Sequence, residues 1–404
     1  MFGTVPRSLK EIYVYDATNL GSRALEYARG AEFVIVSKTI EYKTTNSDGT
    51  INHLGKFYDE NGLAYYDMKP LISNEIKEKL LSFESIASGS EAQGLYVEGV
   101  SYFGTYCFAN MDTIKYAYLE DGTTTTINGE EHTYLDLSQA TFGFRDCNSL
   151  KEIYLMNAEG LLPHAILYEC VSLIRIEVPN TITEIGSYII GWCPNVTEII
   201  LPFYGKQAYT SNDYSSDYHT WEKSFAWIFT DADGVDYNGN YNTGNGYYKG
   251  DHPNYVNKAY NSGVLSSIHG HYTALSYTLT LTSPTANHIN YHSFYDANGL
   301  KEIYIQDTVK FIGNYAFFSC ENIKKFSYYD TTLGERHEVN EGDMRFSSNM
   351  LFLSYYAFNN VDGIKDIIIP NNVTNIEEEV FYAMDYVERL VTPFIGATRD
   401  KPYR

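Results

Sequence analysis

The chain has 404 residues, of which 44% are hydrophobic and 20% charged, so it holds enough apolar side chains to build an extended core. Its formal net charge of −22 opposes attraction to phosphate backbones and anionic lipid, which excludes nucleic acid as an expected partner. No apolar run is long enough to span a bilayer, and the first residues lack the pattern of a signal peptide. We therefore expect no direct membrane insertion of this chain.

A spacing of 23 residues organises the sequence from its first residues to its last. Each copy has a leading apolar residue, a second apolar residue three positions later and a third two positions beyond that. In chain order the copies begin at Leu9, Ala31, Ile114, Leu150, Leu173, Val196, Leu300, Ile323, Ile364 and Val387. The alternation at the end of each copy is typical of a half-buried strand, so the copies together predict a parallel ladder.

A second apolar pair follows several of these predicted strands, after a turn signal of Pro, Asn or Asp. The pairs are Ile182 with Ile185, Val309 with Ile312, and Val373 with Ile376. Each pair predicts a second, shorter strand on the opposite wall of the coil.

A third block precedes most of the long strands and combines a small residue, a large apolar residue and then a small thiol or apolar residue. Phe317, Phe358 and Phe381 take its large position, and Cys147, Cys170, Cys193 and Cys320 take its thiol position. We expect the block to close each coil with its large side chain inside. Neighbouring coils would bring some of the thiols within disulfide reach, but four cysteines in one slot favour small buried free thiols. A stacked column also lacks the tetrahedral arrangement that zinc requires.

These repeats resemble a known family. The segments LKEIYIQDTVKFIGNYAFFSCENIKKF and LIRIEVPNTITEIGSYIIGWCPNVTEIILP are similar to the BspA-like, or Treponema-type, leucine-rich repeat, and the resemblance covers roughly residues 1–36, 99–119, 137–202 and 276–392. It implies a mainly β, right-handed solenoid with a parallel β ladder, interrupted here by loop and hairpin insertions. It also implies an extracellular or cell-surface location and a role in adhesion, and it carries no catalytic residues.

The breaks in the repeat predict the domain organisation. We expect a repeat solenoid over residues 1–202, a Tyr-, Asn- and Gly-rich insertion over 203–275, the continued solenoid over 276–404, and smaller insertions at about 37–98, 120–136 and 330–350. Asn128-Gly129 is a hairpin signal inside the second of these smaller insertions. Because neither end carries a polar cap, we expect a fragment of a longer repeat protein whose export signal lies outside this chain. The alternative is a complete chain capped by its own insertions.

Two columns of residues on the outward side of the predicted ladder are candidates for binding. They are the tyrosines Tyr13, Tyr118, Tyr154 and Tyr304, and beside them the carboxylates Glu11, Glu152, Glu302 and Asp366. Aromatic and acidic side chains on a solvent-facing ladder are suited to a protein or glycan ligand. The alternative is cross-strand packing of the tyrosines, with the charged residues only solvating the sheet.

Metal and catalytic signals are sparse. Asp231, Asp233 and Asp236 alternate as calcium ligands do, but their spacing does not fit an EF-hand, and a solvated loop is the alternative. His269 and His271 lack a third ligand nearby in sequence. Because nucleophile-elbow, phosphate-loop and metalloprotease motifs are absent, we expect no cofactor and no enzyme activity; a site in the 203–275 insertion is the remote alternative.

The sequence therefore predicts an adhesion or binding module that recognises a host or matrix protein, another cell or a glycan. The alternative from a different class is a structural spacer of a larger surface protein, which has no ligand of its own.

Overall fold

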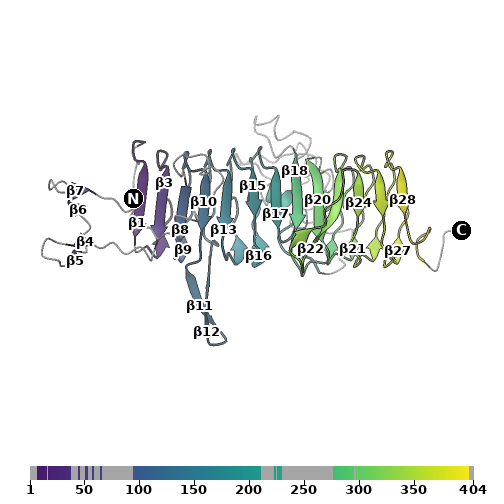
Figure 1. Ribbon diagram of the computed structural model, residues 1–404, viewed down its shortest axis with the longest axis horizontal. Helices are drawn as coiled ribbons and strands as arrows, with labels where there is room; N and C mark the ends of the chain where they lie inside the picture. Colours follow the sequence, from purple (N-terminus) through teal and green to yellow (C-terminus); the bar gives the residue numbers. More distant parts are fainter. Residues whose placement is uncertain are drawn as a thin grey trace, which may run out of the picture. The chain divides into compact units, whose positions relative to one another are not determined.

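The computed structural model describes residues 7–15, 17–37, 94–210, 223, 225–229, 276–294, 297 and 299–399, and four two-residue strands between 44 and 65. The chain forms two compact units, unit 1 over Met1–Glu159 and unit 2 over Gly160–Arg404. Each unit contains its own run of parallel strands, with successive strands side by side (Figure 1).

Unit 1 is built on five parallel strands. In order across the sheet they are β1 (Glu11–Tyr15), β3 (Phe33–Ser37), β8 (Gly94–Glu98), β10 (Tyr116–Leu119) and β13 (Glu152–Leu155). The opposite wall pairs β2 (Asn19–Leu20) with β9 (Tyr102–Phe103). Antiparallel pairs are β4 (Thr44–Thr45) with β5 (Ile51–Asn52), β6 (Phe57–Tyr58) with β7 (Ala64–Tyr65), and β11 (Thr123–Ile127) with β12 (Glu130–Tyr134).

Unit 2 continues the same plan with eight parallel strands. They are β15 (Arg175–Glu177), β17 (Glu198–Leu201), β18 (Tyr277–Leu281), β20 (Leu300–Gln306), β22 (Lys325–Asp330), β24 (Asp343–Arg345), β26 (Asp366–Ile368) and β28 (Arg389–Val391). The opposite wall pairs β14 (Gly160–Leu162) with β16 (Ile182–Ile185), and orders β19 (His288–Ile289), β21 (Phe311–Ile312), β25 (Phe352–Leu353) and β27 (Asn375–Ile376). Strand β23 (Glu335–Arg336) pairs antiparallel with β22, and η4 (Phe225–Ile228) is a 3₁₀-helix.

The register of the strands explains the spacing of the sequence. In unit 2, Ile176 pairs with Ile199 and Ile303 pairs with Phe326, so residues 23 positions apart stand directly beside each other. The leading residues Leu173, Val196, Leu300 and Ile323 are all buried. A parallel ladder places equivalent side chains of neighbouring coils in contact, so each coil covers the apolar side of the next. The predicted mainly β, repeat-solenoid class is confirmed.

The repeat extends further than the sequence suggested in two places. Strand β8 pairs with β3 and β10, although it lies inside the predicted 37–98 insertion. Strand β24 likewise pairs with β22 and β26 inside the predicted 330–350 insertion. Assigning these two strands to insertions was wrong, because a strand can keep its place in the ladder when the chain before it has lost the 23-residue spacing.

The core of each unit contains a column of stacked aromatic rings from the third block. In unit 2 the ring of Phe317 stacks between those of Phe294 and Phe358, at centroid distances of 4.8 and 5.2 Å, and Phe381 stacks on Phe358 at 5.8 Å. In unit 1, Phe108 and Phe144 stack at 4.8 Å. Each large side chain therefore packs on its counterpart in the neighbouring coil.

The cysteines of the third block lie beside this column. All five cysteines of the chain are free and buried. Each thiol of Cys147, Cys193 and Cys320 donates a hydrogen bond to a backbone carbonyl of the adjacent coil, with Sγ–O distances of 3.2, 3.2 and 2.9 Å. Burial raises the pKa of the Cys193 thiol well above its ordinary value. These groups act as small hydrogen-bonding fillers between coils.

A third face of each coil, which we call the turn face, follows the second strand. Its backbones are tied between coils by hydrogen bonds such as Tyr315 N to Tyr355 O (3.1 Å) and Phe317 N to Ala357 O (2.8 Å). Residues four apart on this face, such as Tyr315 and Ser319, both have a φ of 55°. L-residues seldom adopt this left-handed conformation, so the hydrogen bonds between coils must hold it in place.

We expect Phe317→Ala to destabilise unit 2 by about 3–5 kcal/mol, because it removes a buried ring that two neighbouring rings contact. Urea unfolding followed by circular dichroism measures the loss. Leu333→Ala, at a position that is 69% exposed, is the matched control and should leave the midpoint nearly unchanged. Equal losses in the two variants would contradict the stacked core.

Candidate binding surface

The outward face of the unit 1 ladder carries the predicted tyrosine column. Tyr118 on β10 stacks between Tyr96 on β8 and Tyr154 on β13, at ring centroid distances of 5.5 and 6.3 Å. Tyr118 is only 8% exposed, whereas Tyr154 is half-buried. Cross-strand packing, the alternative reading of this column, therefore describes Tyr118, and Tyr154 is the more accessible of the two.

Carboxylates hold the hydroxyl groups of this column. The Tyr96 hydroxyl donates to Glu120 Oε2 at 2.5 Å, and the Tyr154 hydroxyl donates to Glu152 Oε2 at 2.7 Å. Burial, and then the hydrogen bond to Glu120, raise the pKa of Tyr96 far above its ordinary value. The Tyr96 phenol therefore remains a protonated donor, and the half-buried carboxylates of Glu120 and Glu152 present oxygen acceptors to solvent.

The first strand supplies the remaining predicted pair of unit 1. Glu11 is exposed at the start of β1. Tyr13 stands opposite Ile35 in the register of β1 and β3, but its side chain lies outside the described residues.

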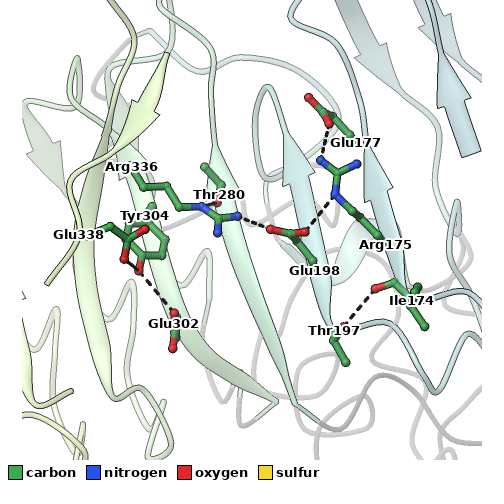
Figure 2. A network of polar contacts seen from close by, with 10 residues as sticks. All are labelled: Ile174, Arg175, Glu177, Thr197, Glu198, Thr280, Glu302, Tyr304, Arg336 and Glu338. Carbon is green, nitrogen blue, oxygen red and sulfur yellow. Dashed lines mark hydrogen bonds and ion pairs between the residues drawn. The ribbon is translucent and has the colours of Figure 1, made fainter. Parts of the chain in front are cut away.

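In unit 2 the outward tyrosine is covered, contrary to the expectation of a solvent-facing ladder. Tyr304 on β20 is 1% exposed. The guanidinium of Arg336, on β23, lies 5.1 Å from the centroid of its ring, and the Tyr304 hydroxyl donates to Glu338 Oε2 at 3.1 Å (Figure 2). Both covering residues belong to the predicted 330–350 insertion, which turns back over the sheet here.

Arg336 continues from Tyr304 across two further strands (Figure 2). Its Nε donates to Thr280 Oγ1 at 2.8 Å, and its Nη2 donates to Glu198 Oε1 at 2.7 Å. The other oxygen of Glu198 accepts a hydrogen bond from Arg175 Nε at 2.9 Å. One carboxylate thus joins two arginines from opposite sides, a charge-assisted arrangement that fixes the position of the β22–β23 hairpin.

Neighbouring strands also neutralise the acidic column of unit 2. Lys325 Nζ lies 3.1 Å from Glu302 Oε1. Asp366 pairs with Arg345 at 3.4 Å and with Arg389 on the strand beyond. These pairs agree with the reading in which charged residues solvate the sheet, and they leave few free carboxylates on this part of the ladder.

The hairpin of β11 and β12 points away from the strands of unit 1 (Figure 1). Its Asn128-Gly129 turn has φ values of 53° and 89°, as the sequence signal suggested. Ile127 at the tip is 52% exposed. Midway along β12, His132 Nε2 lies 2.8 Å from Glu159 Oε1, so this contact holds the lower half of the hairpin and leaves its tip open.

The possible calcium ligands Asp231, Asp233 and Asp236, and the His269–His271 pair, lie outside the described residues. Across the described ranges, no three His, Cys, Asp or Glu side chains converge as a metal ion would require. The same part of the chain has no helix long and apolar enough to cross a membrane.

The sequence missed the residues that cover the unit 2 ladder. Arg336 and Glu338 lie in a segment without the 23-residue spacing, and nothing local indicates that they return to strands laid down much earlier in the chain. The only available signal was the acidic and aromatic face itself, which favours a cation over it.

The charges of the network predict how the stability of unit 2 depends on pH. Burial raises the pKa of Glu198, but Arg336 and Arg175 outweigh it and hold the pKa below the ordinary 4.5. The ionised Glu198 carboxylate therefore stabilises unit 2 above pH 4.5. This contribution is lost as the pH falls through the lowered pKa. We expect Glu198→Gln to be less stable than the wild type at neutral pH, with a difference that shrinks in acid. Thermal unfolding between neutral pH and pH 3 measures this, and a constant difference would contradict it.

Comparison with known proteins agrees with this fold. Residues 137–215 and 287–393 match the family described as BspA type leucine rich repeat region, in six copies. No curated protein matches the chain.

Three solved structures are similar to the chain. A leucine-rich repeat protein from Bacteroides ovatus is 13% identical, with 96% of this chain and 74% of that one covered and a TM-score of 0.35. A leucine-rich cell surface protein from Faecalibacterium prausnitzii is 15% identical, with 95% and 79% covered and a TM-score of 0.27. The pneumococcal vaccine antigen PcpA is 12% identical, with 96% and 80% covered and a TM-score of 0.24.

At these scores the likeness of the structures is loose, and the assignment depends on the matched repeats. Those repeats contain the ladder strands of unit 2 apart from β18, the strands of the opposite wall in unit 2, and β13 in unit 1. Residues 137–215 and 287–393 are therefore BspA-type leucine-rich repeats.

Proposed function

We propose that this chain is a non-enzymatic binding module displayed at a bacterial surface, where it recognises a partner protein or a glycan. The β11–β12 hairpin carries the proposal. Its two strands are largely exposed, it adds little to the core, and its tip presents an apolar side chain, Ile127, to solvent. Loops on a rigid repeat scaffold are where binding usually resides.

The outward face of unit 1 is a second part of the proposed surface. Tyr154 and Glu152 are half-buried and joined by a hydrogen bond, so they offer a fixed ring edge and a carboxylate to a ligand. The family resemblance supports the proposed surface location, because BspA-type repeats are associated with surface proteins and adhesion.

A structural spacer is the second candidate, and a specific observation favours it. Tyr118 and Tyr304 are buried by their neighbours, and Glu302 and Asp366 are paired with cations of adjacent strands. Such a ladder is stable without any ligand.

Screening the full chain against matrix proteins, glycan arrays and bacterial cells separates the two candidates. For a ligand found in this way, we expect Ile127→Ser to weaken binding about tenfold, because truncating a central apolar contact costs more than 1 kcal/mol. Leu333→Ser is the control, since it removes an aliphatic side chain that is even more exposed than Ile127 from the β22–β23 hairpin of unit 2.

A chain that binds nothing in these screens would favour the spacer. A ligand whose affinity is unchanged by Ile127→Ser but falls with Tyr154→Ala would place the contact on the ladder and contradict the role of the hairpin.

A further inference from the structure

The turn face of unit 2 carries a continuous strip of aromatic rings. We define the turn-face strip as Tyr291, Tyr315, Phe318, Tyr355, Tyr356 and Tyr382. The ring of Tyr315 lies 5.8 Å from that of Tyr291, 5.5 Å from that of Phe318 and 5.3 Å from that of Tyr356. The ring of Tyr356 lies 4.1 Å from that of Tyr355 and 5.6 Å from that of Tyr382. The strip thus crosses four successive coils.

The strip is rigid and accessible. Tyr315 and Tyr356 have left-handed backbone conformations, and the Tyr315 amide donates a hydrogen bond to the next coil. The backbone atoms that carry these rings are therefore held in place. Five of the six side chains are half-buried, and Tyr382 is 55% exposed. Fixed, partly exposed aromatic rings provide contact area at a low cost in conformational entropy.

Two carboxylates lie beside the Tyr355–Tyr356 end of the strip. Glu379 is exposed and hydrogen-bonds the hydroxyl of Tyr356, and Glu377 accepts a hydrogen bond from the Tyr355 amide at 2.8 Å. The hydrogen bond to Glu379 raises the pKa of Tyr356 above its ordinary value, so the phenol stays protonated. The field at this end of unit 2 therefore favours a positive ligand.

A second cluster of acidic residues, Glu321, Asp362 and Asp385, lies next to the strip. Asn360 donates its amide to the Tyr382 carbonyl at 3.0 Å and its side chain to Glu321 at 3.0 Å. Burial, and then the charges of Glu321 and Asp385, raise the pKa of Asp362. Within the described ranges, no ion pair involves Glu321, Asp362 or Asp385.

The equivalent rings of unit 1 indicate which chemical group can stack on the turn-face strip. Tyr106 and Phe142 hold the same position in their coils as Tyr315 and Tyr356, and they stack at 5.0 Å. There the chain supplies its own cations: the guanidinium of Arg23 lies 5.2 Å from the Tyr106 centroid, and that of Arg145 lies 5.8 Å from the Phe142 centroid. In unit 2 no described lysine or arginine lies over Tyr315, Tyr356 or Tyr382.

We propose that the turn-face strip binds an arginine-rich segment of a partner protein, whose guanidinium groups stack on Tyr315, Tyr356 and Tyr382 while Glu379 and its neighbours pair with them. Arginine fits better than lysine, because its planar guanidinium stacks on a ring and bonds a carboxylate at the same time. The surface is separate from the β11–β12 hairpin of unit 1, so either proposal can fail alone.

Fluorescence anisotropy with the full chain tests the proposal, using labelled oligoarginine, oligolysine and glycine–serine peptides of equal length. We expect oligoarginine to bind most tightly, oligolysine more weakly and the uncharged peptide not at all. Tyr356→Ser combined with Tyr382→Ser should weaken oligoarginine binding about tenfold, the order expected for two exposed cation–π contacts. Tyr102→Ser, which removes an exposed tyrosine of unit 1, is the matched control and should change nothing.

Tyr356→Phe and Glu379→Gln keep the test sharp if the serine variants unfold, which circular dichroism would reveal. The first keeps the ring and should keep most of the affinity, whereas the second should reduce it. Absence of oligoarginine binding at low salt would overturn the proposal, as would an equal loss of affinity in Tyr102→Ser. So would tighter binding of a neutral oligosaccharide, tested by competition, because the rings would then serve as a sugar platform.

Discussion

The structure depends on one constraint, which is that equivalent apolar residues of successive coils stand directly beside each other. Parallel pairing places Ile176 against Ile199 and Ile303 against Phe326, and the same register stacks Phe317 between Phe294 and Phe358. Because a coil cannot cover its own apolar edge, each one depends on its neighbours, and the stability of a unit is spread along its length. The thiols follow the same rule, since they donate hydrogen bonds to carbonyls of the adjacent coil.

This constraint also determines where variation is allowed. Residues that point inward are fixed by contact on both sides, whereas the chain between two strands can lengthen without disturbing the register. The β11–β12 hairpin grows from such a connection and points away from the ladder. The β22–β23 hairpin does the opposite, because Arg336 reaches Thr280 and Glu198 and covers Tyr304. Both hairpins contain inserted residues, but one adds a free surface to its unit and the other covers one.

Much of the fold was predictable from the sequence, because a repeated contact leaves a repeated residue. The spacing of Leu173, Val196, Leu300 and Ile323 predicted the ladder, and the pairs such as Ile182 with Ile185 predicted the opposite wall. Strands β8 and β24 escaped notice, since the segments before them lack the spacing. The candidate site was less predictable. Alternation along the strands shows that Tyr118 and Tyr304 point outward. It does not show that Tyr96 and Tyr154 bury Tyr118, or that Arg336 covers Tyr304, because these neighbours are distant in sequence. The turn-face strip was missed because tyrosine and phenylalanine carry no local signal for a left-handed backbone.

The stacking of coils in register can be tested directly by disulfide trapping between adjacent strands. Glu302 and Lys325 are paired residues whose Cα atoms should lie about 4.8 Å apart, within disulfide reach. Under mild oxidation we expect Glu302→Cys combined with Lys325→Cys to form a cross-link rapidly and almost completely, whereas Glu302→Cys combined with Arg345→Cys, two strands away, should stay reduced. Equal cross-linking of both pairs, or none in the first, would contradict the register on which the repeat architecture depends.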